Sequence, residues 1–177
     1  MKRLDPLWLP HYAAFVWRAS RDDARLAELF APDAVLVPVP SSGPMRDVRW
    51  TALQLALTLR SLGLGGHVWT GLRRAITVRK SATAPTAARP SVRAHYQSFA
   101  VDVPALPIQR VVLIDDVITR GRTALAAAAR LRTGLPGVDI RAFALIRTLG
   151  FANRLERLIE CCHGVVRWAG GDARRVP

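Results

Sequence analysis

Residues 111–123 read VVLIDDVITRGRT, and this stretch decides the fold. Its run of Val, Leu and Ile without alternation predicts a parallel strand covered by helices on both faces. Asp115 and Asp116 then fall at the carboxyl end of the strand, the edge at which open α/β sheets bind their ligands. A glycine loop follows and leads into an alanine-rich helix expected over residues 123–132. The stretch therefore predicts strand, loop and helix in that order.

The loop after the two acids carries groups that bind phosphate. Thr119 and Thr123 offer hydroxyls, Arg120 and Arg122 offer guanidinium groups, and Gly121 lets the backbone curl where a helix presents unpaired N–H groups. Carboxylates accept hydrogen bonds from vicinal sugar hydroxyls, while a phosphate dianion suits N–H, hydroxyl and guanidinium donors. A solvated strand end and a plain turn would explain either half alone. Both halves in this order predict a sugar-phosphate site.

This pattern resembles the phosphoribosyl-pyrophosphate (PRPP) signature of type I phosphoribosyltransferases, a hydrophobic strand followed by two acids, two further residues and T-x-G-x-T. The resemblance implies that Asp115 and Asp116 hold the ribose 2′- and 3′-hydroxyls and that residues 119–123 wrap the 5′-phosphate. Mg²⁺ would sit mainly on PRPP, with the two acids near its outer shell. The implied reaction moves ribose 5-phosphate from PRPP to a nitrogen nucleophile and releases pyrophosphate.

Residues 34–131 also resemble the ComF-type branch of this family, which is associated with bacterial competence. The likeness rests on VPVP at residues 37–40, on Leu55 and Ala56 in a helix, on HYQSF at residues 95–99 and on the signature itself. Members commonly carry an amino-terminal cysteine zinc module and an R-G-F-N-Q stretch. This sequence has no such module, and the corresponding region reads RDVRWTALQ.

A second anion site is expected because PRPP also carries a pyrophosphate. The candidates in the loop after the first strand are Ser41, Ser42, Gly43 and Arg46. Residues 71–97 are expected to form a flexible loop that closes over the pyrophosphate, and its candidate cations are Arg79, Lys80, Arg89 and Arg93. An ordinary strand-to-helix turn and a solvated basic loop are the alternatives.

A general base is harder to identify. In relatives that salvage 6-oxopurines an acid stands three residues after the second signature acid, and here that residue is Thr119. A hydroxyl is a poor base, which argues against hypoxanthine or guanine as the acceptor. His95 is a candidate base or a structural residue, and His11 and His67 are weaker candidates.

Charge favours anionic partners without choosing among them. Lys and Arg number 26 against 13 Asp and Glu, a formal net charge of +13. Arginine adjoins tryptophan at Trp17, Trp50 and Trp168, which is consistent with nucleic-acid contacts or with buried tryptophans flanked by surface arginines. Two alternatives to the enzyme therefore stay open: a PRPP or nucleotide sensor that lacks the reaction, and a basic DNA-uptake accessory protein.

The sequence also predicts the setting of the protein. Cys161 and Cys162 are expected to be buried, reduced thiols at the end of a helix and not, with His163, a zinc site. We find neither a signal peptide nor an apolar run that could span a membrane, so a cytoplasmic location is expected. Relatives of this type are often dimers, which makes a homodimer a candidate assembly.

The remaining pattern predicts one α/β domain over residues 1–177, with a mainly parallel central sheet flanked by helices and a small hood. Residues 1–33 are expected to form an amino-terminal helix and part of the hood. The expected helices cover residues 22–30, capped by Ser20, and residues 48–62 and 153–160; the other expected strands cover residues 34–39, 67–70, 138–146 and 164–168, the last of them at the end of the sheet.

Overall fold

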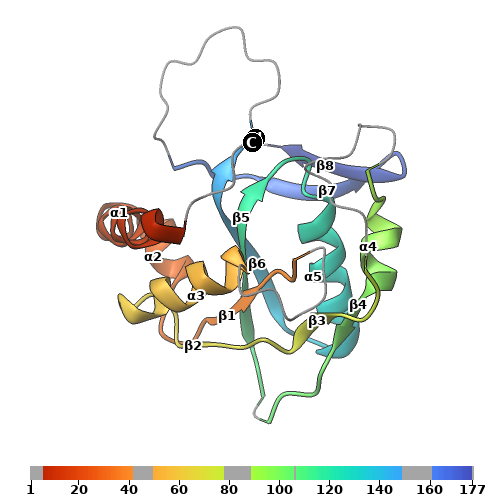
Figure 1. Ribbon diagram of the computed structural model, residues 1–177, viewed down its shortest axis with the longest axis horizontal. Coiled ribbons are helices and arrows are strands. Elements are labelled where there is room, and N and C mark those ends of the chain that lie inside the picture. The colour runs from red at the N-terminus through yellow and green to blue at the C-terminus, as the bar shows by residue number, and fades with distance from the viewer. Residues whose placement is uncertain (1–5, 42–49, 78–88, 106, 149–160, 177) are drawn as a thin grey trace, which may run out of the picture.

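A four-stranded parallel sheet forms the centre of the computed structural model, which describes residues 6–41, 50–77, 89–105, 107–148 and 161–176 (Figure 1). Its strands are β1 (Val35–Pro38), β2 (His67–Val68), β5 (Arg110–Ile118) and β6 (Asp139–Arg147). Their order across the sheet is β2-β1-β5-β6, and every neighbouring pair is parallel. The α/β fold with a parallel sheet flanked by helices is thus confirmed.

Both faces of the sheet are covered, which explains why its central strands are apolar without alternation. On one face, Leu36 and Ile114 pack against α1 (Leu9–Asp22), α2 (Ala24–Leu29) and α3 (Thr51–Ser61). On the other, Val37 and Leu113 pack against α4 (Val92–Ser98) and α5 (Arg122–Gly134). Because neighbouring strand residues point to opposite faces, each central strand supplies side chains to both cores.

The strand order creates a switch point between β1 and β5. The chain leaves β1 through α3 to reach β2 on one side, and leaves β5 through α5 to reach β6 on the other. In sheets of this kind the crevice beyond the carboxyl ends of the two strands is the place where ligands bind. Here β1 pairs with β5 only as far as Pro38 opposite Ile114, whereas β6 accompanies β5 to Ile118.

Smaller elements flank the sheet. A 3₁₀ turn, η1 (Pro6–Trp8), precedes α1. Strands β3 (Leu72–Arg74) and β4 (Phe99–Val101) form an antiparallel pair, and α4 lies between them in the sequence. Strands β7 (Val165–Ala169) and β8 (Asp172–Val176) form an antiparallel hairpin, which lies at the same end of the molecule as the start of α5 (Figure 1).

The helix expected at about residues 22–30 is present as α2 (Ala24–Leu29), but Ser20 as its cap is wrong. The chain forms α1 through Asp22 and then restarts at α2, where Asp23 Oδ1 accepts hydrogen bonds from the backbone N–H groups of Arg25 (2.9 Å) and Leu26 (3.1 Å). Ser20 Oγ instead donates to the Trp17 carbonyl at 2.8 Å. Ser and Asp both cap helices well. Because α1 continues through Asp22, Ser20 lies inside that helix and Asp23 is the residue that caps α2. The partial hood stays a prediction.

The expectation of a flexible loop over residues 71–97 is wrong for the part that the structure describes. Residues 72–74 form β3, and residues 92–98 form α4, whose first turn is capped by Ser91 Oγ accepting from Ala94 N at 3.1 Å. The helix was missed because its buried positions include His95 and Ser98, which do not register in an apolar pattern. Residues 78–88 lie outside the described residues.

Two expectations near the carboxyl end are also wrong. The strand expected at residues 164–168 is β7, but it pairs with β8 in a separate hairpin and not with the central sheet. Its turn uses Gly170 and Gly171, both at positive φ, which favours a tight reversal. Cys161 and Cys162 are exposed, not buried. The helix expected over residues 153–160 lies outside the described residues.

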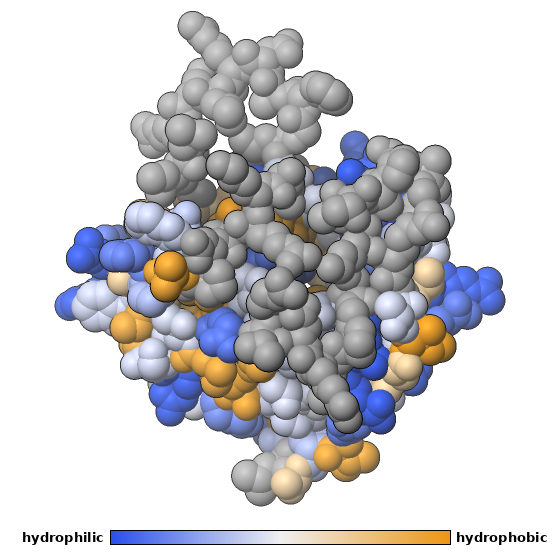
Figure 2. All heavy atoms as spheres, viewed as in Figure 1, coloured by the Kyte–Doolittle hydropathy of each residue, from blue (hydrophilic) through white to orange (hydrophobic). Residues whose placement is uncertain are grey.

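The face of the molecule that Figure 2 shows carries both polar and apolar residues. Figure 2 shows hydrophilic residues around the edge of one face, with apolar residues in small separate groups between them. Among the residues that the structure describes, no helix has the combination of length and apolar character needed to cross a bilayer.

Candidate anion-binding site

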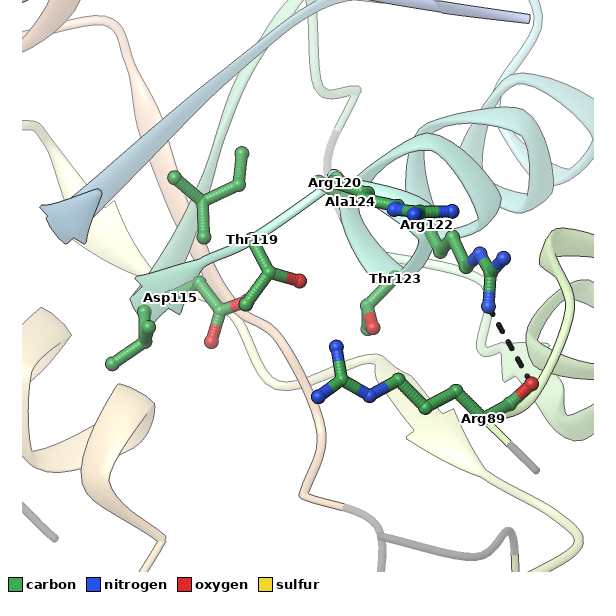
Figure 3. Close-up of a pocket in the computed structure, with 10 residues that line it drawn as sticks. Arg89, Asp115, Thr119, Arg120, Arg122, Thr123 and Ala124 are labelled. Atoms are coloured by element: carbon green, nitrogen blue, oxygen red, sulfur yellow. Dashed lines mark hydrogen bonds between the residues drawn. The ribbon is translucent and has the colours of Figure 1, made fainter. Parts of the chain in front are cut away.

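A hollow that is open to solvent lies where the sequence predicts the site. Its lining consists of Arg89, Asp115, Val117, Ile118 and residues 119–124. Figure 3 shows the side chains of Asp115, Thr119 and Thr123 around one space, with the guanidinium of Arg89 directed toward them. The carboxylate, the two hydroxyls and the loop that were predicted to act together are thus brought together at the carboxyl edge of the sheet.

Gly121 gives the loop its curl. It precedes the first residue of α5 with φ +84°, a left-handed conformation that side chains disfavour. A Cβ placed on it would also lie 2.6 Å from Cγ1 of Val166 in β7. The first N–H groups of any helix lack partners within the helix, so the pocket is lined in part by the positive end of α5.

The two acids differ in their position relative to the pocket. Both lie within β5, which continues to Ile118. Asp115 lines the pocket and Asp116 is not part of that lining, as expected for consecutive residues of a strand. Each carboxylate accepts a hydrogen bond from the following backbone N–H, Asp115 from Asp116 (3.0 Å) and Asp116 from Val117 (2.9 Å).

Asp115 is the electrostatically unusual group of the site. Burial, and then the negative charge of Asp116, raise the pKa of Asp115 well above its ordinary value, and the positive charge of Arg74 opposes this rise only in part. A raised pKa means that the ionised carboxylate lacks sufficient compensating charge in the ligand-free site. Cations and hydroxyl donors are therefore the groups that this end of the pocket favours.

The two arginines of the loop share a counterion that the sequence did not reveal. Asp172 of β8 accepts from Arg122 through both carboxylate oxygens (2.6 and 2.5 Å) and pairs with Arg120 at 3.3 Å. This pairing lowers the pKa of Asp172 to about 2, with the Arg122 hydrogen bonds as the largest cause. Arg122 Nη1 also lies 3.5 and 3.4 Å from the carbonyl oxygens of Arg89 and Pro90. Arg122 thus holds the hairpin and the residues before α4 against the loop.

His95 occupies a position that does not suit a general base. Its side chain is 3% exposed, and it is absent from the pocket lining. Burial, followed by the positive charges of Arg74 and Arg122, lowers its pKa to about 4. The ring instead lies behind Thr123, in a buried polar cluster with Arg74 and Ser98.

The remaining candidates divide into those that reach the site and those that do not. Arg89 lines the pocket, whereas Arg93 lies on the exposed side of α4. Ser41 ends the described part of the loop after β1, and its carbonyl accepts from Arg74 Nε at 3.0 Å. His11 contacts Trp8, and His67 is exposed in β2. The candidates outside the described residues are Ser42, Gly43, Arg46, Arg79 and Lys80.

The tryptophans next to arginines differ in environment. Trp50 is buried and donates its Nε1–H to the Val39 carbonyl at 2.8 Å, so it is part of the core. Trp17 and Trp168 are exposed, on α1 and β7. The interpretation that all three tryptophans are buried is therefore wrong. A nucleic-acid role for the two exposed tryptophans stays a prediction.

No protein-family model matches the sequence, and no curated protein matches it. The interpretation of the site therefore rests on its residues and their geometry.

Replacing Gly121 by Ala should destabilise the protein more than the same change at Gly137, which has φ +82° and open space around its Cα. Both changes incur the left-handed penalty of about 1–2 kcal/mol, and Gly121→Ala adds an overpacking cost of about 1–3 kcal/mol against Val166. Urea unfolding of both variants measures the difference. Adding Val166→Ala should restore part of the loss only in Gly121→Ala; equal losses in the two single variants would contradict the packing.

The Asp172 pair should make stability depend on pH. Because the folded-state pKa of Asp172 lies below its ordinary value, the pair stabilises the fold above about pH 4 and loses this contribution as the pH falls toward about 2. Asp172→Asn should therefore reduce the free energy of unfolding by roughly 1 kcal/mol at neutral pH, since the pair is partly screened by solvent. The difference from wild type should shrink toward pH 2. In an Arg122→Met background Asp172→Asn should cost little at any pH, and a pH-independent difference would contradict the assignment.

Proposed function

We propose that this protein is a phosphoribosyltransferase that binds PRPP in the pocket and transfers ribose 5-phosphate to a nitrogen nucleophile, with release of pyrophosphate. One observation carries the proposal: Asp115, Thr119, Gly121 and Thr123 line a single hollow at the carboxyl end of β5, one of the two strands that border the switch point of the sheet. These are the residues on which the resemblance to the PRPP signature rests.

The end of the pocket at α5 suits the 5′-phosphate. The hydroxyls of Thr119 and Thr123 and the first turn of a 13-residue helix supply neutral donors and a positive dipole end. Arg120 and Arg89 add positive charge at the rim of the hollow. Since Arg122 is engaged by Asp172, we assign it to shaping the loop and not to direct phosphate contact.

The end at Asp115 suits the ribose and a hard cation. Its carboxylate can accept from ribose hydroxyls, and its raised pKa indicates unmet negative charge. Within the described ranges, no group of three or more His, Cys, Asp or Glu residues is arranged to hold a metal ion. These features fit Mg²⁺ carried mainly by PRPP and water, with Asp115 and Asp116 near its outer shell. Bound there, the ion would neutralise charge on the leaving pyrophosphate.

The chemistry at C1′ explains why these residues are sufficient for much of the work. Substitution at this carbon passes through a cationic sugar, as in glycoside hydrolysis, so the enzyme must hold the sugar, stabilise the leaving anion and exclude water. Asp115 lies beside the developing positive charge in this arrangement. Arg89 supplies a cation on the opposite side of the hollow (Figure 3).

A second candidate, a PRPP sensor without turnover, is favoured because no evident general base lies among the described residues at the pocket. Thr119 has only a hydroxyl, and His95 is buried with its ring held by Arg74. If the protein is an enzyme, its acceptor is accordingly a nucleophile that needs no strong base, such as an amine. Both functions fit a cytoplasmic location, where PRPP is made and thiols such as Cys161 and Cys162 stay reduced.

PRPP with Mg²⁺ should raise the melting temperature of the wild-type protein. Binding to the folded state alone stabilises it by about 2.7 kcal/mol at a ligand concentration 100-fold above Kd. Asp115→Asn should remove most of the rise because it lines the pocket, and Asp116→Asn should remove less. Thermal denaturation with and without the ligand measures all three proteins.

The control is Asp33→Asn, which changes the charge equally at the opposite edge of the sheet, where Asp33 pairs with Arg110 at 3.2 Å. It should keep the full rise. An equal loss in the Asp33 and Asp115 variants would mean that the rise does not depend on the pocket, because both changes make the net charge one unit more positive. An undiminished rise in Asp115→Asn would contradict the site.

Turnover separates the enzyme from the sensor. With a panel of amines and nucleobases, the wild-type protein should release pyrophosphate in an acceptor-dependent manner, and Asp115→Asn should reduce the rate at least about tenfold. A coupled pyrophosphate assay measures this. Saturable PRPP binding without release for any acceptor would favour the sensor.

A further inference from the structure

A buried polar cluster behind the pocket has no role in the function proposed so far. It is centred on His95 of α4, whose Nδ1 lies 3.2 Å from Nη2 of Arg74 and whose Nε2 lies 3.5 Å from Oγ1 of Thr123. Thr123 lines the pocket and His95 does not. The cluster therefore connects a core arginine to a hydroxyl at the surface of the hollow.

Several contacts fix the position of the Arg74 guanidinium, which in turn orients the imidazole ring of His95. Its Nε donates to the Ser41 carbonyl at 3.0 Å, and its Nη1 donates to Ser98 Oγ. Its guanidinium also lies 4.2 Å from the centre of the Phe99 ring. The Ser98 hydroxyl donates to the His95 carbonyl at 2.6 Å, so the Ser98 hydroxyl oxygen can accept from Arg74. Every partner of the guanidinium is thus an acceptor, as an arginine requires.

The protonation of His95 follows from this arrangement. Arginine has donors and no acceptor, so the ring nitrogen that faces Arg74 must be the unprotonated one. A neutral imidazole then carries its single proton on Nε2, the nitrogen that faces Thr123. Burial and two neighbouring arginines keep the ring neutral.

The state of the Thr123 hydroxyl follows in turn. Its oxygen accepts from His95 Nε2–H, so its own proton must point to another acceptor. A threonine hydroxyl otherwise rotates freely between donor and acceptor roles. We propose that Arg74 and His95 are positioning residues that hold the Thr123 hydroxyl as a hydrogen-bond donor toward a phosphate oxygen in the pocket.

This inference rests on the anion-binding part of the proposed function and explains how the site favours phosphate. A donor fixed before binding costs less to order when the anion arrives. It also favours an ionised phosphate oxygen, because hydrogen bonds to a charged acceptor are stronger than those to a neutral one.

Two matched variants separate positioning from mere support. In His95→Gln an amide N–H can reach the place of Nε2 and keep the donor to Thr123. In His95→Asn the shorter amide can still accept from Arg74 but cannot reach Thr123. We expect the Kd for ribose 5-phosphate, measured by calorimetry, to stay within about twofold of wild type in His95→Gln and to rise about 3–10-fold in His95→Asn, as for one lost hydrogen bond.

A double-mutant cycle tests whether the effect runs through the hydroxyl. Thr123→Val should weaken binding by a similar factor, and adding His95→Asn to it should change the Kd no further. Equal Kd values for wild type, His95→Gln and His95→Asn would overturn the inference while leaving the proposed function intact. Additive losses in the double variant would overturn it as well.

A spectroscopic measurement on ligand-free protein tests the first step without any variant. Nitrogen-15 NMR of the His95 ring should show a neutral ring with the proton on Nε2. A proton on Nδ1 would overturn the inference even if the histidine variants fail to fold. Wild-type protein that binds neither ribose 5-phosphate nor PRPP would overturn both this inference and the proposed function.

Discussion

The site depends on a mismatch in length between the neighbours of β5. Strand β1 stops pairing with β5 opposite Ile114, while β6 continues to Ile118. Among the described strands, the last part of β5 therefore pairs with β6 alone. Asp115 is the first residue of that part, and its carboxylate lies in the hollow.

The net charge of +13 does not show that particular arginines near the site are paired or buried. Arg122 is neutralised by Asp172, and Arg74 is buried among acceptors, where desolvation lowers its pKa to about 10 and so leaves it charged at neutral pH. The contacts of these two arginines hold the segments around the site in place. The lining also contains neutral donors together with Arg89 and Arg120, a combination that suits a phosphate group.

Strand, loop and first turn of α5 could be predicted because their signals are local: an apolar run, a glycine and small residues in sequence. The choice between Ser20 and Asp23 as a helix cap could not, because it depends on where the preceding helix ends. Asp172 and the link between Arg74 and His95 could not be predicted for a different reason. Their contacts join residues 21 to 52 positions apart, and no pattern within a short window records such a contact.

The hairpin contact at Gly121 has a consequence for the order of folding. The curl of residues 119–123 is held by Val166 and Asp172, which belong to a hairpin separated from it in the chain by all of α5 and β6. Contacts of such long range form late, because closing the intervening chain costs entropy before the contact repays it. We therefore expect the proposed phosphate site to be completed near the end of folding. Under the proposed function, partly folded chains that still lack the hairpin would bind no sugar phosphate.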